Sequence, residues 1–126
     1  MKCHSAGLKA INEMTGSGRL LRVEMGLWDG LQFVCEYSGF TVGDASTQYT
    51  MNYTAYLTES SNVSGDSLIG HRGMKFSTPD RDNDAFDGNC AANVDPGGWW
   101  FFNCASCNPN GSFNISGKGR GSRGMF

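Results

Sequence analysis

The stretch "STPDRDNDAFDGNC", residues 77–90, places three aspartates at alternate positions, Asp80, Asp82 and Asp84. Calcium prefers about six to eight hard oxygen ligands from carboxylates, backbone carbonyls and water. Alternate residues of a tight loop can direct their carboxylates toward one point. An EF-hand would require glycine directly after Asp84 and glutamate at the end of the loop, and this sequence has alanine in both places. The stretch is therefore either a solvated acidic turn or a cation site of another kind.

Two cysteines bracket the segment that follows the aspartates. Cys90 and Cys104 enclose "GGWWFFN", residues 97–103. A bridge between them would restrain the unfolded chain and add about 3 kcal/mol of stability in the loop-entropy model. A rigid loop edge beside an acidic turn favours an extracellular calcium site over a plain solvated turn.

The composition is that of one folded domain. Of 126 residues, 17% are charged and 39% are hydrophobic, and the net charge of −2 gives no support for a surface that binds nucleic acid or anionic membranes. The 18 glycines indicate a turn-rich fold that is largely β or irregular. No apolar run approaches the ~18 residues of a transmembrane helix.

Cysteine content and glycosylation motifs favour the secretory route. The sequence has five cysteines and carries Asn-x-Ser/Thr sequons at Asn52, Asn62, Asn110 and Asn114. Residues 1–5 lack the apolar core of a signal peptide. This combination predicts that the sequence is a piece of a longer, secreted glycoprotein.

Hydrophobic periodicity predicts a short helix followed by an antiparallel sheet. Ser5 is the expected N-cap of a helix whose apolar residues recur every three positions from Leu8 to Met14. Period-two alternation predicts three strands, over residues 19–27, 31–37 and 48–57. Beyond residue 58 turn-forming residues dominate, so a long irregular lobe is expected to follow the sheet.

Six segments together resemble the fibrinogen-related domain, the family of fibrinogen chains, ficolins, tachylectins, tenascins and angiopoietins. The segments that carry the resemblance are "GLKAINEMT" (7–15), "RLLRVEMGLWDG" (19–30), "YSGFTVGDAS" (37–46), "GDSLIGHRGMKFSTPDRDNDAFDGNC" (65–90), "GGWWFFNC" (97–104) and "NPNG" (108–111). The resemblance runs from about Ala6 to Phe113. It implies an α+β fold, an antiparallel β-sheet with short helices and a long irregular calcium-binding lobe. Residues 1–126 are expected to form a partial domain without the family's N-terminal subdomain and final strand.

The resemblance implies a specific set of calcium ligands. In the family, two aspartates and two backbone carbonyls hold a calcium ion in the matching loop. Carried over position by position, these are the carboxylates of Asp82 and Asp84 and the carbonyls of Phe86 and Gly88. Asp80 is expected to lie outside this ligand set.

A disulfide and a ligand pocket are also implied by the resemblance. The disulfide joins Cys90 to Cys104, and the pocket beside it involves Phe101, Asn103, Cys104 and Ala105. Acetyl-binding lectins of the family commonly have tyrosine in place of Phe101 and histidine in place of Ala105, so fewer polar groups would orient a ligand here. Asn103 is retained, and the Asn103–Cys104 peptide bond is expected to be cis.

The other cysteines leave alternatives open. Cys107 forms a CxxC pair with Cys104, which elsewhere indicates redox chemistry or a metal site. No second CxxC accompanies it, which favours a structural role. Cys35 is expected to be a small buried thiol on its strand, and Cys3 lies in a segment that matches nothing in the family.

The histidines and the basic tail give little support to other classes of protein. A hydrolase needs a nucleophile beside a base, but His4 lies in the unmatched terminus and His71 is expected to serve packing or hydrogen bonding. The Gly- and Arg-rich residues 117–124 are weakly similar to RNA-binding segments and are interpreted as a solvated loop. The protein is therefore expected not to be an enzyme.

The expected function is that of a secreted calcium-binding recognition module with lectin-like binding of glycans or acetylated ligands in innate defence. The alternative is a protein-binding module of extracellular matrix, clotting or growth-factor type. Both assignments are made by analogy with the family, and a fold does not by itself determine function. The expected partners are a glycan or an extracellular protein, and the full-length protein is expected to form homo-oligomers.

Overall fold

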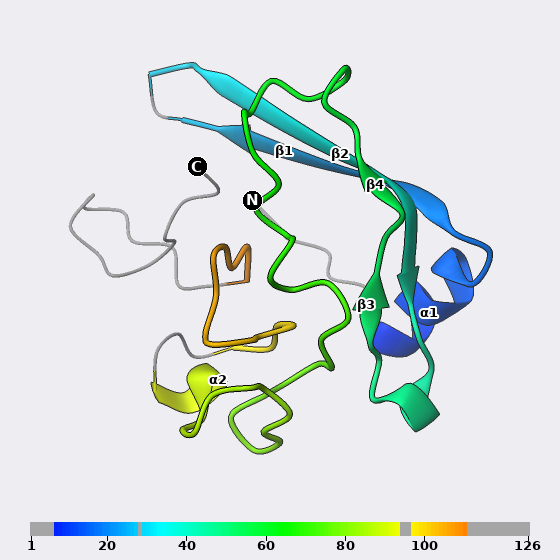
Figure 1. Ribbon diagram of the computed structural model, residues 1–126, viewed down its shortest axis with the longest axis vertical. Helices are drawn as coiled ribbons and strands as arrows, with labels where there is room; N and C mark the ends of the chain where they lie inside the picture. The colour runs from blue at the N-terminus through cyan, green and yellow to red at the C-terminus, as the bar shows by residue number, and fades with distance from the viewer. Residues whose placement is uncertain (1–6, 28, 94–96, 111–126) are drawn as a thin grey trace. The chain divides into compact units, whose positions relative to one another are not determined.

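The computed structural model describes residues 7–27, 29–93 and 97–110. The protein divides into two compact units, Met1–Val63 and Ser64–Phe126, and each is described by itself. The first holds a β-sheet, one α-helix and the short 3-10 helix η1, Ala45–Thr47, and the second consists mainly of turns (Figure 1). These elements agree with the predicted α+β class. Among the described residues, no helix has the length and apolar character needed to cross a membrane.

Helix α1, Leu8–Thr15, opens the first unit. Its N-cap is Gly7, which makes no side-chain capping bond, so the predicted cap at Ser5 is wrong, and Ser5 itself lies outside the described residues. Met14 is 55% exposed, so the expected apolar face is only partly buried. The helix ends against strand β2, because the Thr15 hydroxyl accepts the N–H of Val42 at 2.9 Å and donates to the carbonyl of Ile11 at 2.8 Å.

Strands β1, Arg19–Gly26, and β2, Gln32–Val42, form an antiparallel hairpin that pairs Val23 with Cys35. The turn closes with the N–H of Leu27 donating to the carbonyl of Leu31 at 2.8 Å, and Gly30 takes the positive φ of 89° that such turns favour. The alternation predicted for the first strand is confirmed. The second strand extends past its predicted end at residue 37, through a register shift opposite Arg19.

The third predicted strand is present as two short pieces, so the expectation of one continuous strand over residues 48–57 is wrong. Strand β3, Met51–Asn52, pairs with Thr41 and Val42, and strand β4, Ala55–Tyr56, pairs with Tyr37 and Ser38. Both pieces keep the same register against β2, which is the central strand of the sheet.

The interruption between β3 and β4 lies opposite Gly39, whose φ is 61°. A Cβ atom at Gly39 would collide with the Thr54 hydroxyl, so the close approach requires glycine. The core of this unit includes Tyr37, whose ring centroid lies 5.0 Å from that of Tyr53 and 5.2 Å from that of Tyr56.

One charged residue is buried in the sheet of the first unit. Glu36 follows the buried Cys35, and its carboxylate lies 2.6 Å from the guanidinium of Arg22 on β1. Hydrogen bonds from the Ser60 hydroxyl and from Arg22 lower the pKa of Glu36, in that order of size. The carboxylate of Glu36 on β2 is therefore bound by the side chains of Arg22 and Ser60.

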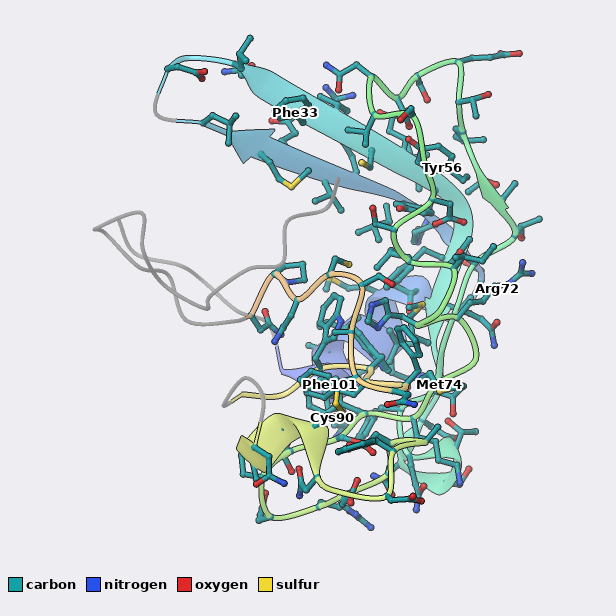
Figure 2. The ribbon with its side chains drawn as sticks, turned by 60° about the vertical axis from the view of Figure 1, so that its left-hand side comes forward. Phe33, Tyr56, Arg72, Met74, Cys90 and Phe101 are labelled. Atoms are coloured by element: carbon teal, nitrogen blue, oxygen red, sulfur yellow. A yellow bond between two sulfur atoms is a disulfide. The ribbon has the colours of Figure 1, made fainter. Side chains whose placement is uncertain are left out.

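The second unit matches the predicted irregular lobe. Helix α2, Cys90–Asn93, is its only described helix. Ser77 and Trp99 form an isolated antiparallel β-bridge. The N–H of Ser77 donates to the carbonyl of Trp99 at 2.9 Å, and the N–H of Trp99 donates to the carbonyl of Ser77 at 3.1 Å. Its interior is aromatic, as the side chains around the labelled Phe101 illustrate (Figure 2). The buried residues of this unit are Leu68, His71, Ser77, Cys90, Ala91, Trp99, Trp100, Phe101, Cys107 and Asn108.

Candidate functional site

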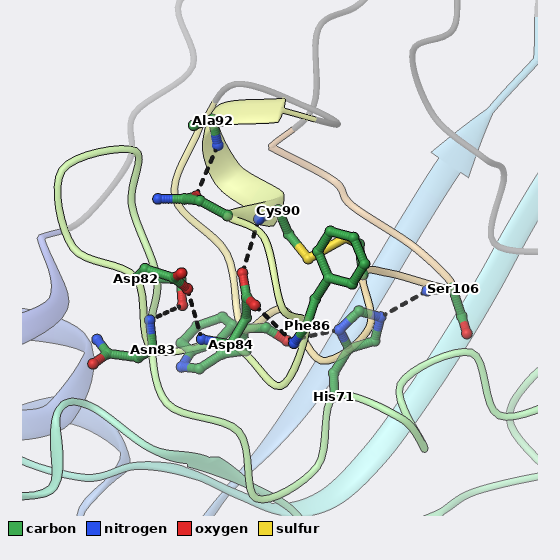
Figure 3. Close-up of a disulfide and its surroundings, with 12 residues drawn as sticks. His71, Asp82, Asn83, Asp84, Phe86, Cys90, Ala92 and Ser106 are labelled. Atoms are coloured by element: carbon green, nitrogen blue, oxygen red, sulfur yellow. Dashed lines mark hydrogen bonds between the residues drawn. A yellow bond between two sulfur atoms is a disulfide. The ribbon is translucent and has the colours of Figure 1, made fainter.

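Two aspartates of the acidic loop, residues 80–90, shape it by accepting hydrogen bonds from the loop's own backbone. Asp82 accepts the N–H of Asp84 at 3.2 Å, and Asp84 accepts the N–H of Phe86 at 2.9 Å (Figure 3). Each carboxylate thus binds the amide two residues further on, which is the local bond that aspartate favours in turns. The same residues that are predicted to bind a cation therefore set the shape of the loop.

Asp84 also connects the loop to the disulfide. Its second carboxylate oxygen accepts the N–H of Cys90 at 2.9 Å, and Cys90 is bonded to Cys104 with a Cα–Cα distance of 5.4 Å. The implied disulfide is present. The CxxC cysteine Cys107 lies outside this bond and is buried, with its sulfur 3.7 Å from the carbonyl of Ser67.

A buried serine and an asparagine anchor the acidic loop to the segment before it. Ser77 is completely buried and its hydroxyl accepts the N–H of Asn83 at 2.9 Å, while the Asn83 amide donates to the carbonyl of Phe76 at 2.7 Å. The sequence reasoning did not identify this pair. The signal in the sequence is a polar residue directly after Phe76 and an asparagine between the candidate ligands Asp82 and Asp84.

Asp80 differs from the two aspartates that follow it. The hydroxyl of Thr78 donates to its carboxylate at 2.7 Å, and this bond is the main cause of the lowered pKa of Asp80. Its side chain is exposed and already has a local partner. This geometry is consistent with the expectation that Asp80 lies outside the ligand set.

The loop offers hard oxygen atoms for a cation. Within the described residues, no hydrogen bond uses the carbonyl oxygens of Phe86 and Gly88. Together with the carboxylates of Asp82 and Asp84 they would give an all-oxygen donor set, which would suit calcium better than a softer metal. The part of the protein that the structure describes contains no cluster of three or more His, Cys, Asp and Glu side chains suited to a metal. Backbone carbonyls would therefore have to complete any site here.

Gly88 lies close to the ring of Phe86. A Cβ atom at Gly88 would lie 2.8 Å from the ring of Phe86, which is 42% exposed. The ring lies over the backbone of the loop, and a side chain at position 88 would displace it. The two residues expected to supply carbonyl ligands are thus in van der Waals contact.

The predicted ligand residues lie in one segment, residues 101–105, but occupy different environments. Phe101 is completely buried, Asn103 is exposed, and Cys104 and Ala105 are half-buried. The Asn103–Cys104 peptide bond is cis, as the resemblance implies. The structure thus leaves Asn103 and Ala105 accessible and encloses the ring of Phe101 in the core. We call residues 101–105 the ligand segment.

A backbone hydrogen bond joins the acidic loop to the ligand segment. The N–H of Ala85 donates to the carbonyl of Phe102 at 2.9 Å, and the N–H of Phe102 donates to the carbonyl of Cys104 at 2.8 Å. The acidic loop and the ligand segment are therefore linked twice, through the N–H of Ala85 and through the disulfide.

His71 supports the ligand segment from inside the unit. Its Nε2 atom accepts the N–H groups of Ser106 and Cys107 at 3.2 and 3.3 Å (Figure 3). Nδ1 must then carry the proton, and it donates to the carbonyl of Trp100 at 2.8 Å. Burial lowers the pKa of His71, with the Trp100 carbonyl opposing the shift. The predicted role of His71 in packing and hydrogen bonding is confirmed.

Comparisons with known proteins agree on one family. The family model of the C-terminal globular domain of fibrinogen beta and gamma chains matches residues 4–126, which extends the predicted match at both ends. The protein is 38% identical over 119 residues to fibrinogen-like protein 1 of Mesocricetus auratus, an alignment that covers 85% of this sequence and 36% of that protein.

Two solved structures are similar in fold. The fibrinogen-like globe domain of human ANGPTL2 is 37% identical with a TM-score of 0.78, over 86% of this protein and 49% of that one. Lamprey fibrin D-dimer, complexed with the peptide ligand Gly-His-Arg-Pro-amide, is 30% identical with a TM-score of 0.79, over 86% of this protein and 37% of that one. The sequence therefore spans about half or less of the proteins it matches.

Proposed function

Because the protein belongs to the family of the fibrinogen C-terminal globular domain, we propose that it is an extracellular, calcium-binding recognition module whose ligand is another protein. Members of this family include binding modules of matrix and clotting proteins, among them tenascin-R and the fibrinogen alpha chain. The sequence spans only 36% of fibrinogen-like protein 1. The partners of the whole protein are therefore proposed here and do not follow from the similarity.

Calcium would be held by the carboxylates of Asp82 and Asp84 and by the carbonyls of Phe86 and Gly88. The ion would supply positive charge that neutralises two neighbouring carboxylates and fixes the loop. Water would complete its coordination, because four protein oxygens are fewer than calcium prefers. This fits an exposed loop such as the one that carries Asp82.

The observation that carries the proposal is the pair of bonds made by Asp84. Its two carboxylate oxygens bind the N–H groups of Phe86 and Cys90, and Cys90 is covalently joined to Cys104. A cation on Asp84 would therefore stabilise the edge of the segment that carries Asn103 and Ala105. We infer that calcium acts on ligand binding indirectly, by holding this segment in place.

The chemistry of the accessible residues favours a protein ligand over an acetylated sugar. Ala105 has no polar side-chain atom, and Phe101 has no hydroxyl and is enclosed in the core. A small-ligand site depends on a few precisely placed polar groups to orient its ligand, whereas a protein interface combines an apolar core with a polar rim. The exposed Asn103 amide and the exposed Phe86 ring supply that mixture.

Lectin-like binding is the second candidate. The retained, exposed Asn103 favours it, because the resemblance implies this residue for the pocket of the family. The missing polar groups at positions 101 and 105 argue for weak binding of acetylated sugars. His71 is not proposed as a general base, since both of its ring nitrogens are engaged by backbone groups.

The extracellular location is part of the same proposal. A disulfide bond between Cys90 and Cys104 is stable in oxidising compartments, and relatives such as fibrinogen and tenascin-R are extracellular. Homo-oligomerisation is also part of the proposal. That part of the proposal rests on the family resemblance alone.

Calorimetry with calcium, followed by binding to arrays, tests the proposal. The protein is titrated with calcium and then applied to an array of extracellular proteins and to a glycan array, each with and without chelator. Protein binding that the chelator abolishes supports the proposal, and binding confined to acetylated glycans selects the lectin. The absence of any heat of calcium binding at millimolar calcium overturns the calcium part.

A further inference from the structure

The four glycosylation sequons of the protein are not equivalent in sequence. Asn52-Tyr53-Thr54 ends in threonine, whereas the sequons at Asn62, Asn110 and Asn114 end in serine. Asn114 lies outside the described residues, so the structure distinguishes the first three.

Asn52 presents its amide to solvent. It lies on strand β3 between Met51 and Tyr53, which are 1% and 3% exposed. Because side chains alternate along a strand, Asn52 lies on the opposite face, and it is exposed. Its side-chain amide makes no hydrogen bond within the part of the protein that the structure describes.

Asn62 uses its amide to hold its own segment against β2. Its Oδ1 atom accepts the N–H of Val34 at 2.7 Å, and its Nδ2 atom donates to the carbonyl of Gln32 at 3.0 Å. The backbone N–H of Asn62 also donates to the carbonyl of Val34 at 3.0 Å. A sugar on Nδ2 would have to replace one amide hydrogen and fit between this nitrogen and the strand.

Asn110 is engaged in a similar way. Its Nδ2 atom donates to the carbonyl of Gly98 at 2.8 Å, and its backbone N–H donates to the side-chain oxygen of Asn108 at 3.1 Å. Both Asn62 and Asn110 therefore have their acceptor nitrogen in a hydrogen bond to the backbone. Of the described sequons, only Asn52 has an unengaged amide.

We propose that Asn52 carries an N-linked glycan in the folded, secreted protein and that Asn62 and Asn110 do not. The inference rests on the extracellular location in the proposed function. In the reaction, Asn52 Nδ2 attacks the anomeric carbon of an oligosaccharide linked to a lipid diphosphate. The new C–N bond replaces the bond between sugar and phosphate, the lipid diphosphate leaves, and the amide nitrogen loses one proton.

The glycan would also cover one edge of the sheet. Among the described strands, β3 pairs with β2 alone, so its outer edge carries no further strand (Figure 1). Exposed sheet edges are templates for pairing with another polypeptide. A bulky, hydrated sugar beside this edge would hinder such pairing without disturbing the buried Met51 and Tyr53.

Site-by-site occupancy tests the inference. The protein is directed into the secretory pathway of a eukaryotic cell, and the secreted and intracellular pools are collected separately. Peptide N-glycosidase treatment in heavy-oxygen water converts each occupied asparagine to a labelled aspartate, which peptide mass spectrometry assigns to a residue. Asn52→Gln and Asn62→Gln are matched variants, each removing one sequon without a large change in volume.

The expected result is nearly complete labelling at Asn52 in the secreted pool, with little at Asn62 or Asn110. Occupancy at Asn62 should be lower in the secreted pool than in the intracellular pool, because molecules modified there fold less well. The glycan mass should be lost from Asn52→Gln and kept in Asn62→Gln. An unlabelled Asn52, or secreted protein occupied equally at Asn62, overturns the inference.

This readout is independent of calcium and of any ligand. An unoccupied Asn52 in a protein that still binds calcium defeats the glycan inference and leaves the proposed function standing. A glycosylated Asn52 in a protein that binds neither calcium nor a protein ligand supports the glycan inference and defeats the proposed function.

Discussion

The carboxylate of Asp84 accepts the backbone N–H of Cys90 at 2.9 Å, and this bond joins the acidic loop to the disulfide-bonded segment. Hydrogen bonds to a charged acceptor are stronger than those between neutral groups, at about 1.5–3 kcal/mol. Asp84 therefore has a structural role even without a cation. A substitution at Asp84 would change loop structure and cation binding together, so the cleaner test of the metal is at Asp82.

Asp82→Asn should abolish the stabilisation by calcium. At roughly ten to a hundred times the Kd, a bound ion stabilises the folded state by about 1.4 to 2.7 kcal/mol, and extracellular calcium modules bind with Kd of about 10⁻⁴–10⁻³ M. Asparagine keeps an oxygen that can accept the N–H of Asp84 but removes the charge. Thermal unfolding with calcium and with chelator measures the difference.

Asp80→Asn is the matched control for this experiment. Its carboxylate is engaged by Thr78, so the calcium-induced shift should remain nearly unchanged. Equal loss of the shift in both variants would mean that the ligand assignment is wrong.

Removing the disulfide should cost about 3 kcal/mol of stability, the value expected for a loop of this length. The double variant Cys90→Ala with Cys104→Ala, measured by urea unfolding, checks this. It should also weaken calcium binding, because the disulfide restrains the backbone N–H of residue 90 that binds Asp84. Non-reducing peptide mapping should show the Cys90–Cys104 pair, and a dominant link from either residue to Cys107 would contradict the pairing.

Local patterns in the sequence predicted the hairpin well, since Val23 and its neighbours alternate between exposed and half-buried environments. The break between β3 and β4 was not predictable in the same way, because it depends on Gly39 of another strand. The cap at Gly7 escaped prediction since it makes no side-chain bond that a residue type would reveal.

In the candidate site, too, some features are visible in the local sequence and others are not. The aspartates are visible in the sequence, but their ligand roles and the pairing of Cys90 with Cys104 came from family resemblance. The partners of His71 lie 29 to 36 residues away in the sequence, at Trp100, Ser106 and Cys107. No local pattern encodes contacts at that separation, so only the fold reveals that His71 supports the ligand segment.

The stability of the protein should fall as the pH drops below about 6.5, the usual pKa of histidine. Burial lowers the pKa of folded His71, so in acid the unfolded state takes up this proton first. The stabilising contribution is full above the unfolded pKa and is lost as the pH falls toward the lower pKa of the folded state. Urea midpoints from pH 8 to about pH 5 measure the loss.

His71→Gln should flatten this pH dependence while lowering stability at neutral pH, because glutamine does not titrate. Asp44, Asp80 and Glu36 also have lowered pKa values, but their ordinary values of 3.8, 3.8 and 4.5 place their effect at lower pH. An unchanged slope between about pH 5 and 7 in the variant would show that another group is responsible.

Gly39→Ala should destabilise the first unit by about 1–3 kcal/mol or more, because the left-handed conformation is costly for alanine. Its new methyl group would also collide with the Thr54 hydroxyl before any relaxation. Gly26→Ala is the matched control, since no heavy atom lies within 4 Å of its Cβ position. Urea unfolding of both variants measures the difference, and equal effects would refute the steric argument.

The native protein should bind N-acetylglucosamine weakly or not at all. Ala105 cannot donate the hydrogen bond that a histidine would give, and sites built on such bonds lose affinity sharply without them. Ala105→His adds an imidazole at a half-buried position and should increase capture on acetylated resin. Chelator should reduce that capture, because calcium acts through the loop that Asp84 ties to Cys90.

Phe101→Tyr tests whether position 101 contributes as well. Its ring is completely buried, so a hydroxyl there enters the core and should lower stability by about 1–3 kcal/mol unless it finds a partner. The double variant should therefore capture no more sugar than Ala105→His alone if the ring stays enclosed. Greater capture by the double variant would mean that residue 101 reaches the ligand. Tight, chelator-sensitive capture by the native protein would favour the lectin over the protein-binding module.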